Sequence, residues 1–128
     1  MNFRQSFHYE TAFVADTYKE LLQIPLHNHN SILTNLIVQN KVSSSTNVSI
    51  TIQYLSPADG TTTVDLEVIE TVSLTSTRTH NYMGNSATST ANIGFNLHLP
   101  AGAKIFIKSS VLNALNVVAT VKHYSSES

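Results

Sequence analysis

The segment Asn47–Leu55, NVSITIQYL, decides the fold class because apolar and polar residues alternate along it. In an extended chain Ile50 and Ile52 lie on one side, with Ser49 and Thr51 on the other. β-branched residues occur on both sides, which favours a strand over a helix. The segment therefore predicts a strand with one face in the core.

Turn residues follow this strand, and then a second alternating run begins. Pro57, Asp59 and Gly60 form a turn cluster, and TVDLEVIETVSL continues from residue 63 to residue 74. The two runs predict a hairpin. NIGFNLHL at 92–99 and KIFIKSS at 104–110, separated by the PAGA break, predict a second hairpin in the same way.

Three further runs complete the expected core. They are YKELLQIPL at 18–26, SILTNLIVQN at 31–40 and LNALNVVATVKHY at 112–124. The run at 31–40 is apolar on both sides, which is typical of a central strand covered on both faces. The total of roughly seven or eight short strands predicts an all-β chain with a single antiparallel β-sandwich, jelly-roll or immunoglobulin-like. The sandwich is expected at 17–124, between an N-terminal arm at 1–16 and a polar tail at 125–128.

The composition excludes several classes of function. Lys and Arg number 7 against 8 Asp and Glu, for a net charge of −1, so the sequence predicts no nucleic-acid partner. Cysteine is absent, which excludes disulfides and thiolate metal sites. No apolar run is long enough for a membrane span and no signal peptide is recognisable, so we expect a soluble chain with no membrane partner.

No common enzyme signature occurs in the sequence, so we expect no catalytic residues and no cofactor. Asp65 and Glu67 share one side of a predicted strand, where solvent-facing acids are ordinary. His27 and His29 would also share a side of an extended chain, but a metal site needs further ligands. Pro25 and the neighbouring asparagines favour a hairpin turn, which leaves the two histidines as weak metal candidates.

Two segments outside the strand pattern are candidates for contact with other proteins. The first is the N-terminal arm, whose aromatic side chains could dock on another subunit or pack on the chain's own core. The second is a long loop predicted at 76–91, because loops of this length are often functional. The candidate interface residues are Phe3, Phe7, Tyr9, Phe13, His80, Asn81, Tyr82 and Met83.

Two stretches carry a resemblance to a known family. LLQIPLHNHNSILTNLIVQNKVSSSTNVSITIQYL at 21–55 and LHLPAGAKIFIKSSVLNALNVVATVKHY at 97–124 resemble small virion structural proteins of tailed bacteriophages, especially marine and cyanobacterial ones. The aromatic arm and the loop at 76–91 depart from that pattern.

The resemblance implies a non-enzymatic β-sandwich subunit repeated on a virion and assembled in the host cytoplasm. Such a subunit would be a capsid decoration or cement protein, or a neck or tail accessory protein. Its expected partners are copies of itself and other virion proteins, such as the major capsid, portal or tail proteins.

The alternative is a carbohydrate- or receptor-binding β-sandwich module on a tail or fibre. The sequence has no tryptophan, but five tyrosines could stack on sugars: Tyr9, Tyr18, Tyr54, Tyr82 and Tyr124. Joint exposure of Tyr82, His80 and Asn81 on the predicted loop would favour this alternative.

Overall fold

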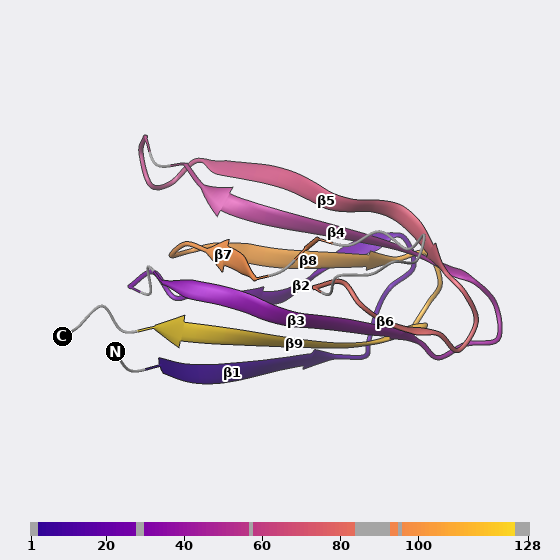
Figure 1. Cartoon of the computed structure of the whole chain (residues 1–128). Coiled ribbons are helices and arrows are strands. Elements are labelled where there is room, and N and C mark those ends of the chain that lie inside the picture. The colour runs from indigo at the N-terminus through magenta and orange to yellow at the C-terminus, as the bar shows by residue number, and fades with distance from the viewer. Residues whose placement is uncertain (1–2, 28–29, 57, 84–92, 95, 125–128) are drawn as a thin grey trace.

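The computed structural model describes residues 3–27, 30–56, 58–83, 93–94 and 96–124. These residues form strands and connections, and no helix occurs among them (Figure 1). The strands are β1 (Phe3–Glu10), β2 (Thr17–Gln23), β3 (Ser31–Asn40), β4 (Thr46–Leu55), β5 (Thr63–Leu74), β6 (Thr79–Asn81), β7 (Leu97–Leu99), β8 (Lys104–Ser109) and β9 (Leu115–Tyr124). The expected all-β class is confirmed.

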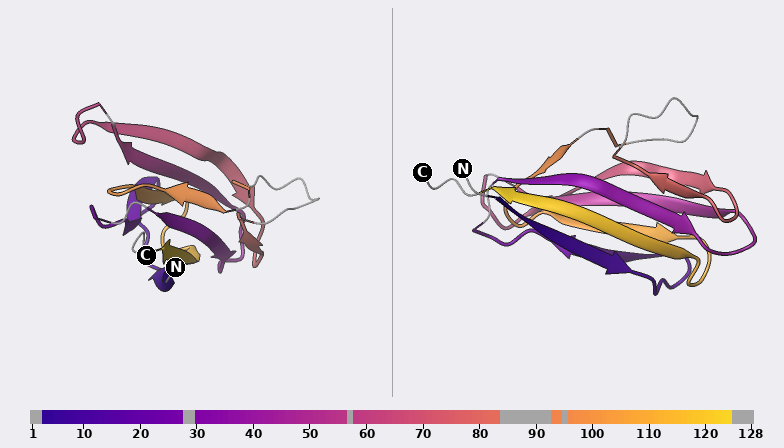
Figure 2. Two further views of the ribbon diagram at one scale, coloured as in Figure 1. Left: turned by 60° about the vertical axis from the view of Figure 1, so that its left-hand side comes forward. Right: turned by 60° about the horizontal axis from the view of Figure 1, so that its bottom comes forward.

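The strands make two antiparallel sheets, which is consistent with a β-sandwich (Figure 2). Sheet A has the order β1-β9-β3-β6, and β7 also pairs with β3. Sheet B has the order β2-β8-β4-β5. Both sheets supply fully buried side chains to one core; these include Leu33, Leu36, Val117 and Val121 from sheet A and Val48, Ile50, Ile52 and Ile107 from sheet B.

A register shift in β3 changes which of its residues face the core. The pairing with β9 slips between Leu33 and Asn35, so Leu33 and Leu36 are both buried although they are three residues apart. Such a bulge turns the following side chains to the other face. Ile32 and Ile37 are consequently half-buried on the outer face, and β3 lies inside sheet A as expected.

The hairpin predicted around residues 47–74 is confirmed, because β4 and β5 are antiparallel neighbours in sheet B. The second predicted hairpin is wrong. β7 pairs with β3 in sheet A, whereas β8 lies between β2 and β4 in sheet B. A Pro/Gly break between two apolar runs marks a change of direction, but it does not tell a hairpin from a crossing between sheets.

The predicted turn around the histidine pair is also not a hairpin. β2 belongs to sheet B and β3 to sheet A, so the chain changes sheets between Gln23 and Ser31. The crossing starts beside the β7–β8 connection, where Ile24 N donates to Ala103 O at 2.8 Å and Gly102 N donates to Ile24 O at 3.0 Å. Gly102 has φ +81°, a left-handed conformation that favours glycine.

The N-terminal segment differs from the expected arm. β1 pairs along its whole length with β9, from Phe3 opposite Tyr124 to Glu10 opposite Val117. Phe13 is 2% exposed and belongs to the core. The sequence pattern does not predict this strand, because its inward positions carry polar residues, among them Ser6 and His8, instead of an apolar alternation. The polar tail expected at 125–128 lies outside the described residues.

Replacement of Ile52 by serine should test the assignment of Ile52 to the covered part of the inner face of sheet B. Ile52 is fully buried, whereas Leu66, its partner on β5 and on the same face of the sheet, is 53% exposed. Ile52→Ser leaves a cavity and a buried hydroxyl, so we expect a loss of about 3–5 kcal/mol in unfolding free energy. The matched Leu66→Ser change should cost less than about 1 kcal/mol. Urea unfolding measures both, and equal losses would contradict this assignment.

Candidate functional site

The candidate residues of the predicted 76–91 loop are mostly inside the molecule. β6 pairs with β3, and His80, Tyr82 and Met83 are buried. The His80 ring meets the Tyr82 ring edge-on, with centroids 4.6 Å apart. Asn81 is half-buried, and its side-chain oxygen accepts from Met83 N at 3.0 Å. The expectation of an exposed contact loop is wrong for these residues, and residues 84–91 lie outside the described part.

The aromatic residues expected at the N-terminus divide into two groups. Phe7 and Tyr9 on β1 are 69% and 64% exposed, as a contact surface requires. Phe13 is buried instead, and the side chain of Phe3 lies outside the description. The sequence could not separate them, because the difference depends on which face of β1 is outward and on how the β1–β2 connection, which contains Phe13, packs on the core.

Phe7 and Tyr9 belong to a row of apolar side chains that crosses the outer face of sheet A. Tyr9 lies opposite Val118 on β9, which in turn lies opposite Ile37 on β3. Directly paired residues of neighbouring strands share a face. Phe7, two residues before Tyr9, projects from the same face of β1. We call Phe7, Tyr9, Val118 and Ile37 the outer-face row.

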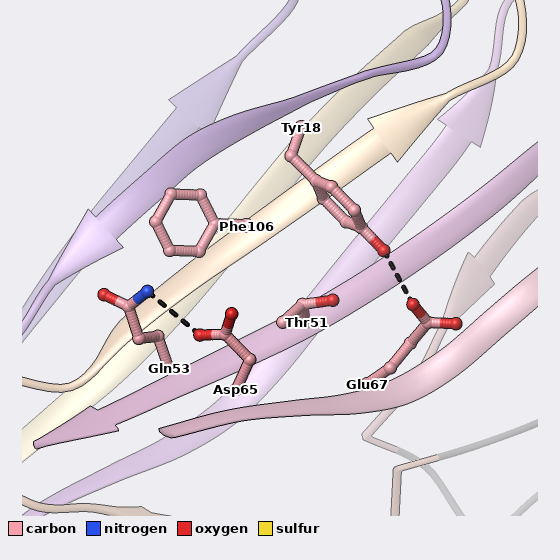
Figure 3. Close-up of a pocket in the computed structure, with 6 residues that line it drawn as sticks. All are labelled: Tyr18, Thr51, Gln53, Asp65, Glu67 and Phe106. Atoms are coloured by element: carbon pink, nitrogen blue, oxygen red, sulfur yellow. Dashed lines mark hydrogen bonds between the residues drawn. The ribbon is translucent and has the colours of Figure 1, made fainter. Parts of the chain in front are cut away.

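A hollow of about 360 Å³ lies on the outer face of sheet B (Figure 3). We call it the sheet-B trough. Its lining comes from all four strands of the sheet: Tyr18 from β2, Phe106 from β8, Thr51 and Gln53 from β4, and Asp65 and Glu67 from β5. Two aromatic rings thus share one open surface with two carboxylates, an amide and a hydroxyl.

Strand register brings these side chains together. Phe106, Thr51 and Glu67 are successive partners across β8, β4 and β5. Tyr18 Oη donates to Glu67 Oε2 at 3.0 Å, although β2 and β5 are the two outermost strands of the sheet. Gln53 Nε2 donates to Asp65 Oδ1 at 2.9 Å. Asp65 and Glu67, which the sequence alone predicts to be ordinary solvent-facing acids, therefore belong to a hydrogen-bonded surface.

Two lysines lie beside the trough on the same face of sheet B. Lys108 Nζ lies 4.9 Å from the centroid of the Tyr18 ring, a cation–π distance. Lys104, the strand partner of Gln53, forms an ion pair with Glu20 at 3.4 Å. The surface thus combines two carboxylates with nearby positive charge.

Hydrogen-bonded serine and histidine side chains, which we call the polar cluster, link the edge strand β1 to β9 and β3. Ser6 Oγ lies 2.8 Å from His123 Nε2 and 3.0 Å from His8 Nε2. Ser31 Oγ lies 2.8 Å from His123 Nδ1, so the cluster joins β1, β9 and β3. Burial lowers the pKa of His8. Burial and the nearby charges of Arg4 and His8 lower the pKa of His123.

The metal hypothesis gains no support from the geometry. His27 is exposed on the crossing after β2, and His29 lies outside the described residues. Within the part of the chain that the structure describes, no three His, Asp or Glu side chains lie together as metal ligands would. The described residues likewise include no helix with the length and apolar character of a membrane span.

No family model, curated protein sequence or solved structure matches this chain. Its function must therefore follow from its own surfaces. Two of these surfaces lie on the outer faces of different sheets. The outer-face row is suited to contact with an apolar protein surface. The sheet-B trough is suited to a small polar ligand that also has an apolar side.

The polar cluster predicts that stability falls with acid. Because His8 and His123 have lowered pKa values in the folded chain, the unfolded chain binds protons first as the pH drops below about 6.5. The unfolding free energy should therefore be highest above that pH and decrease as the pH falls toward the folded pKa values. Urea unfolding from pH 8 to pH 5 measures this dependence.

Variants assign the effect to the cluster. His8→Gln combined with His123→Gln should flatten the pH dependence, whereas His27→Gln on the exposed crossing should leave it unchanged. An unchanged slope in the double variant would contradict the assignment.

Proposed function

We propose that this chain is a non-enzymatic structural subunit of a tailed-phage virion, present as a homo-oligomer. The strand order β1-β9-β3-β6 against β2-β8-β4-β5 supports a jelly-roll form of the β-sandwich. Jelly rolls occur in viral capsid domains and also in lectins. The fold therefore agrees with the resemblance to virion proteins, but function has to be argued from the surface.

The outer-face row is the observation that carries the proposal. It places two exposed aromatic side chains next to half-buried Val118 and Ile37. Aromatic side chains are enriched at protein interfaces and supply much of their binding energy. The small net charge of −1 gives copies of the chain little mutual repulsion.

The edge strand β1 adds a second means of contact. Among the described residues β1 pairs with β9 alone, so its other edge carries backbone groups that can bond to another strand. Burial of the row between identical copies would give a closed symmetric oligomer, the usual form of a soluble homo-oligomer. On the particle, this oligomer would serve as a capsid decoration protein or as a neck or tail accessory protein, in contact with capsid, portal or tail proteins.

The alternative of a sugar-binding module around Tyr82 loses its basis. Tyr82 is fully buried and His80 is 7% exposed, so neither offers a stacking surface.

Replacement of Phe7 and Tyr9 by serine should dissociate the homo-oligomer. Burial of each aromatic side chain contributes about 1.5–3 kcal/mol, so the double change should weaken association by roughly 100-fold or more. Light scattering coupled to size-exclusion chromatography measures the mass of the parent and the variant. Val64→Ser, which removes a 52% exposed apolar side chain from sheet B, should keep the parent mass. A monomeric parent, or a double variant with the parent mass, would contradict this interface.

Quantitative mass spectrometry of purified particles of the source virus tests the virion assignment. A copy number comparable to that of the major capsid protein indicates a decoration protein, and a few copies to about a dozen indicate a neck or tail position. Absence of the chain from purified particles would contradict the proposal.

A further inference from the structure

The sheet-B trough is not required for the self-association proposed above. It is formed by sheet B, whereas the outer-face row belongs to sheet A. We propose that the trough is a binding site for an uncharged saccharide, with one pyranose ring placed between its aromatic and its acidic side. The inference depends on the lining residues alone and stands independently of the virion role.

The two sides of the trough match the two kinds of surface on a sugar ring. In Figure 3, Phe106 and Tyr18 lie on one side, Asp65 and Glu67 on the other, and Thr51 lies between them. A pyranose has an apolar C–H face, which packs on aromatic rings, and a rim of hydroxyl groups, which form hydrogen bonds. Phe106 is half-buried and Tyr18 is 36% exposed, so both rings retain accessible surface.

The carboxylates are oriented before a ligand arrives. Tyr18 Oη holds Glu67 and Gln53 Nε2 holds Asp65, each through one hydrogen bond. An ionised carboxylate can accept about four hydrogen bonds, so each acid keeps capacity for donors from the ligand. Sugar hydroxyls are such donors. Because the carboxylates are already held on a sheet, binding needs little further ordering of the site.

The surrounding charges select an uncharged ligand. Asp65 and Glu67 disfavour phosphates, sulfates and acidic sugars, since an anion would have to approach two carboxylates. Lys108 at the Tyr18 ring disfavours a basic peptide on the same surface, and the Lys104–Glu20 ion pair adds no net charge to it. A saccharide without charge satisfies both constraints, and about 360 Å³ is at the lower end of the volumes of ligand sites, which limits the occupant to one or two sugar rings.

Titration of the ¹⁵N-labelled full chain with sugars tests this site directly. The probes are glucose, galactose, mannose, N-acetylglucosamine and their simple disaccharides, with glucuronic acid as the acidic counterpart of glucose. We expect amide shifts at Thr51, Gln53, Asp65 and Phe106 for at least one uncharged probe, with a dissociation constant on the order of 0.1–10 mM. Glucuronic acid should bind more weakly than glucose.

Conservative variants separate binding from folding. Glu67→Gln and Asp65→Asn keep the shape of the side chains and remove the charge, and Phe106→Leu keeps apolar volume and removes the ring. Each should weaken binding at least fivefold while the thermal unfolding midpoint stays within a few degrees. His27→Gln, on the exposed crossing after β2 and outside both surfaces, is the matched control and should bind like the parent.

Three results would overturn the inference: no shift at the trough with any of the probes, unchanged affinity in all three trough variants, or tighter binding of glucuronic acid than of glucose. None of them bears on the copy number in particles or on the oligomer mass. Failure of the saccharide site and failure of the virion role are therefore distinguishable.

Discussion

The structure depends on one constraint, which is that each sheet must cover the apolar inner face of the other. Every connection except β4–β5 and β6–β7 consequently passes from one sheet to the other. Such crossings leave backbone groups at the ends of the core without ladder partners, and buried polar groups need hydrogen bonds. Asn40, which is fully buried, supplies such hydrogen bonds where the β3–β4 and β5–β6 connections lie together. Its side-chain nitrogen donates to Ser44 O at 2.8 Å and Leu74 O at 3.0 Å, and its side-chain oxygen accepts from Val42 N at 3.1 Å.

Because most of both inner faces is covered by the core, the two surfaces argued for function lie on the outer faces. On sheet A this produces the outer-face row, and on sheet B it produces the sheet-B trough. The two surfaces belong to different sheets, so association of copies through one leaves the other accessible. The edge strand β1 is the exception to an apolar inner face, since it meets the sheet through the serine and histidine side chains of the polar cluster. We therefore expect acid to weaken the attachment of β1 to sheet A, because the pKa values of His8 and His123 are lowered in the folded chain.

The strands with regular alternation could be predicted, and those without it could not. The β4–β5 hairpin follows from the alternation on either side of the Pro57–Gly60 turn cluster, and its residues pair as expected. β1 lacks such alternation, because the polar residues Ser6 and His8 occupy its inward positions. β7 and β8 were each recognised as extended, but their assignment to different sheets is invisible in the pattern. The pattern also does not reveal that Tyr82 and Met83 are buried, because they directly follow β6, whose three residues are too few to show a period.

By itself, the sequence determined the all-β class and the position of the first hairpin, since both depend on residue type and local spacing. Only the tertiary structure decided which aromatic residues are exposed and which side chains from other strands lie beside Asp65 and Glu67. Phe7 and Phe13 look alike in the sequence, yet Phe7 is exposed and Phe13 is buried in the core. Tyr18 and Glu67 are 49 residues apart, and their hydrogen bond exists because β8 and β4 lie between β2 and β5. The physical reason is that a site built across strands depends on register and strand order, which are set by packing of the whole chain.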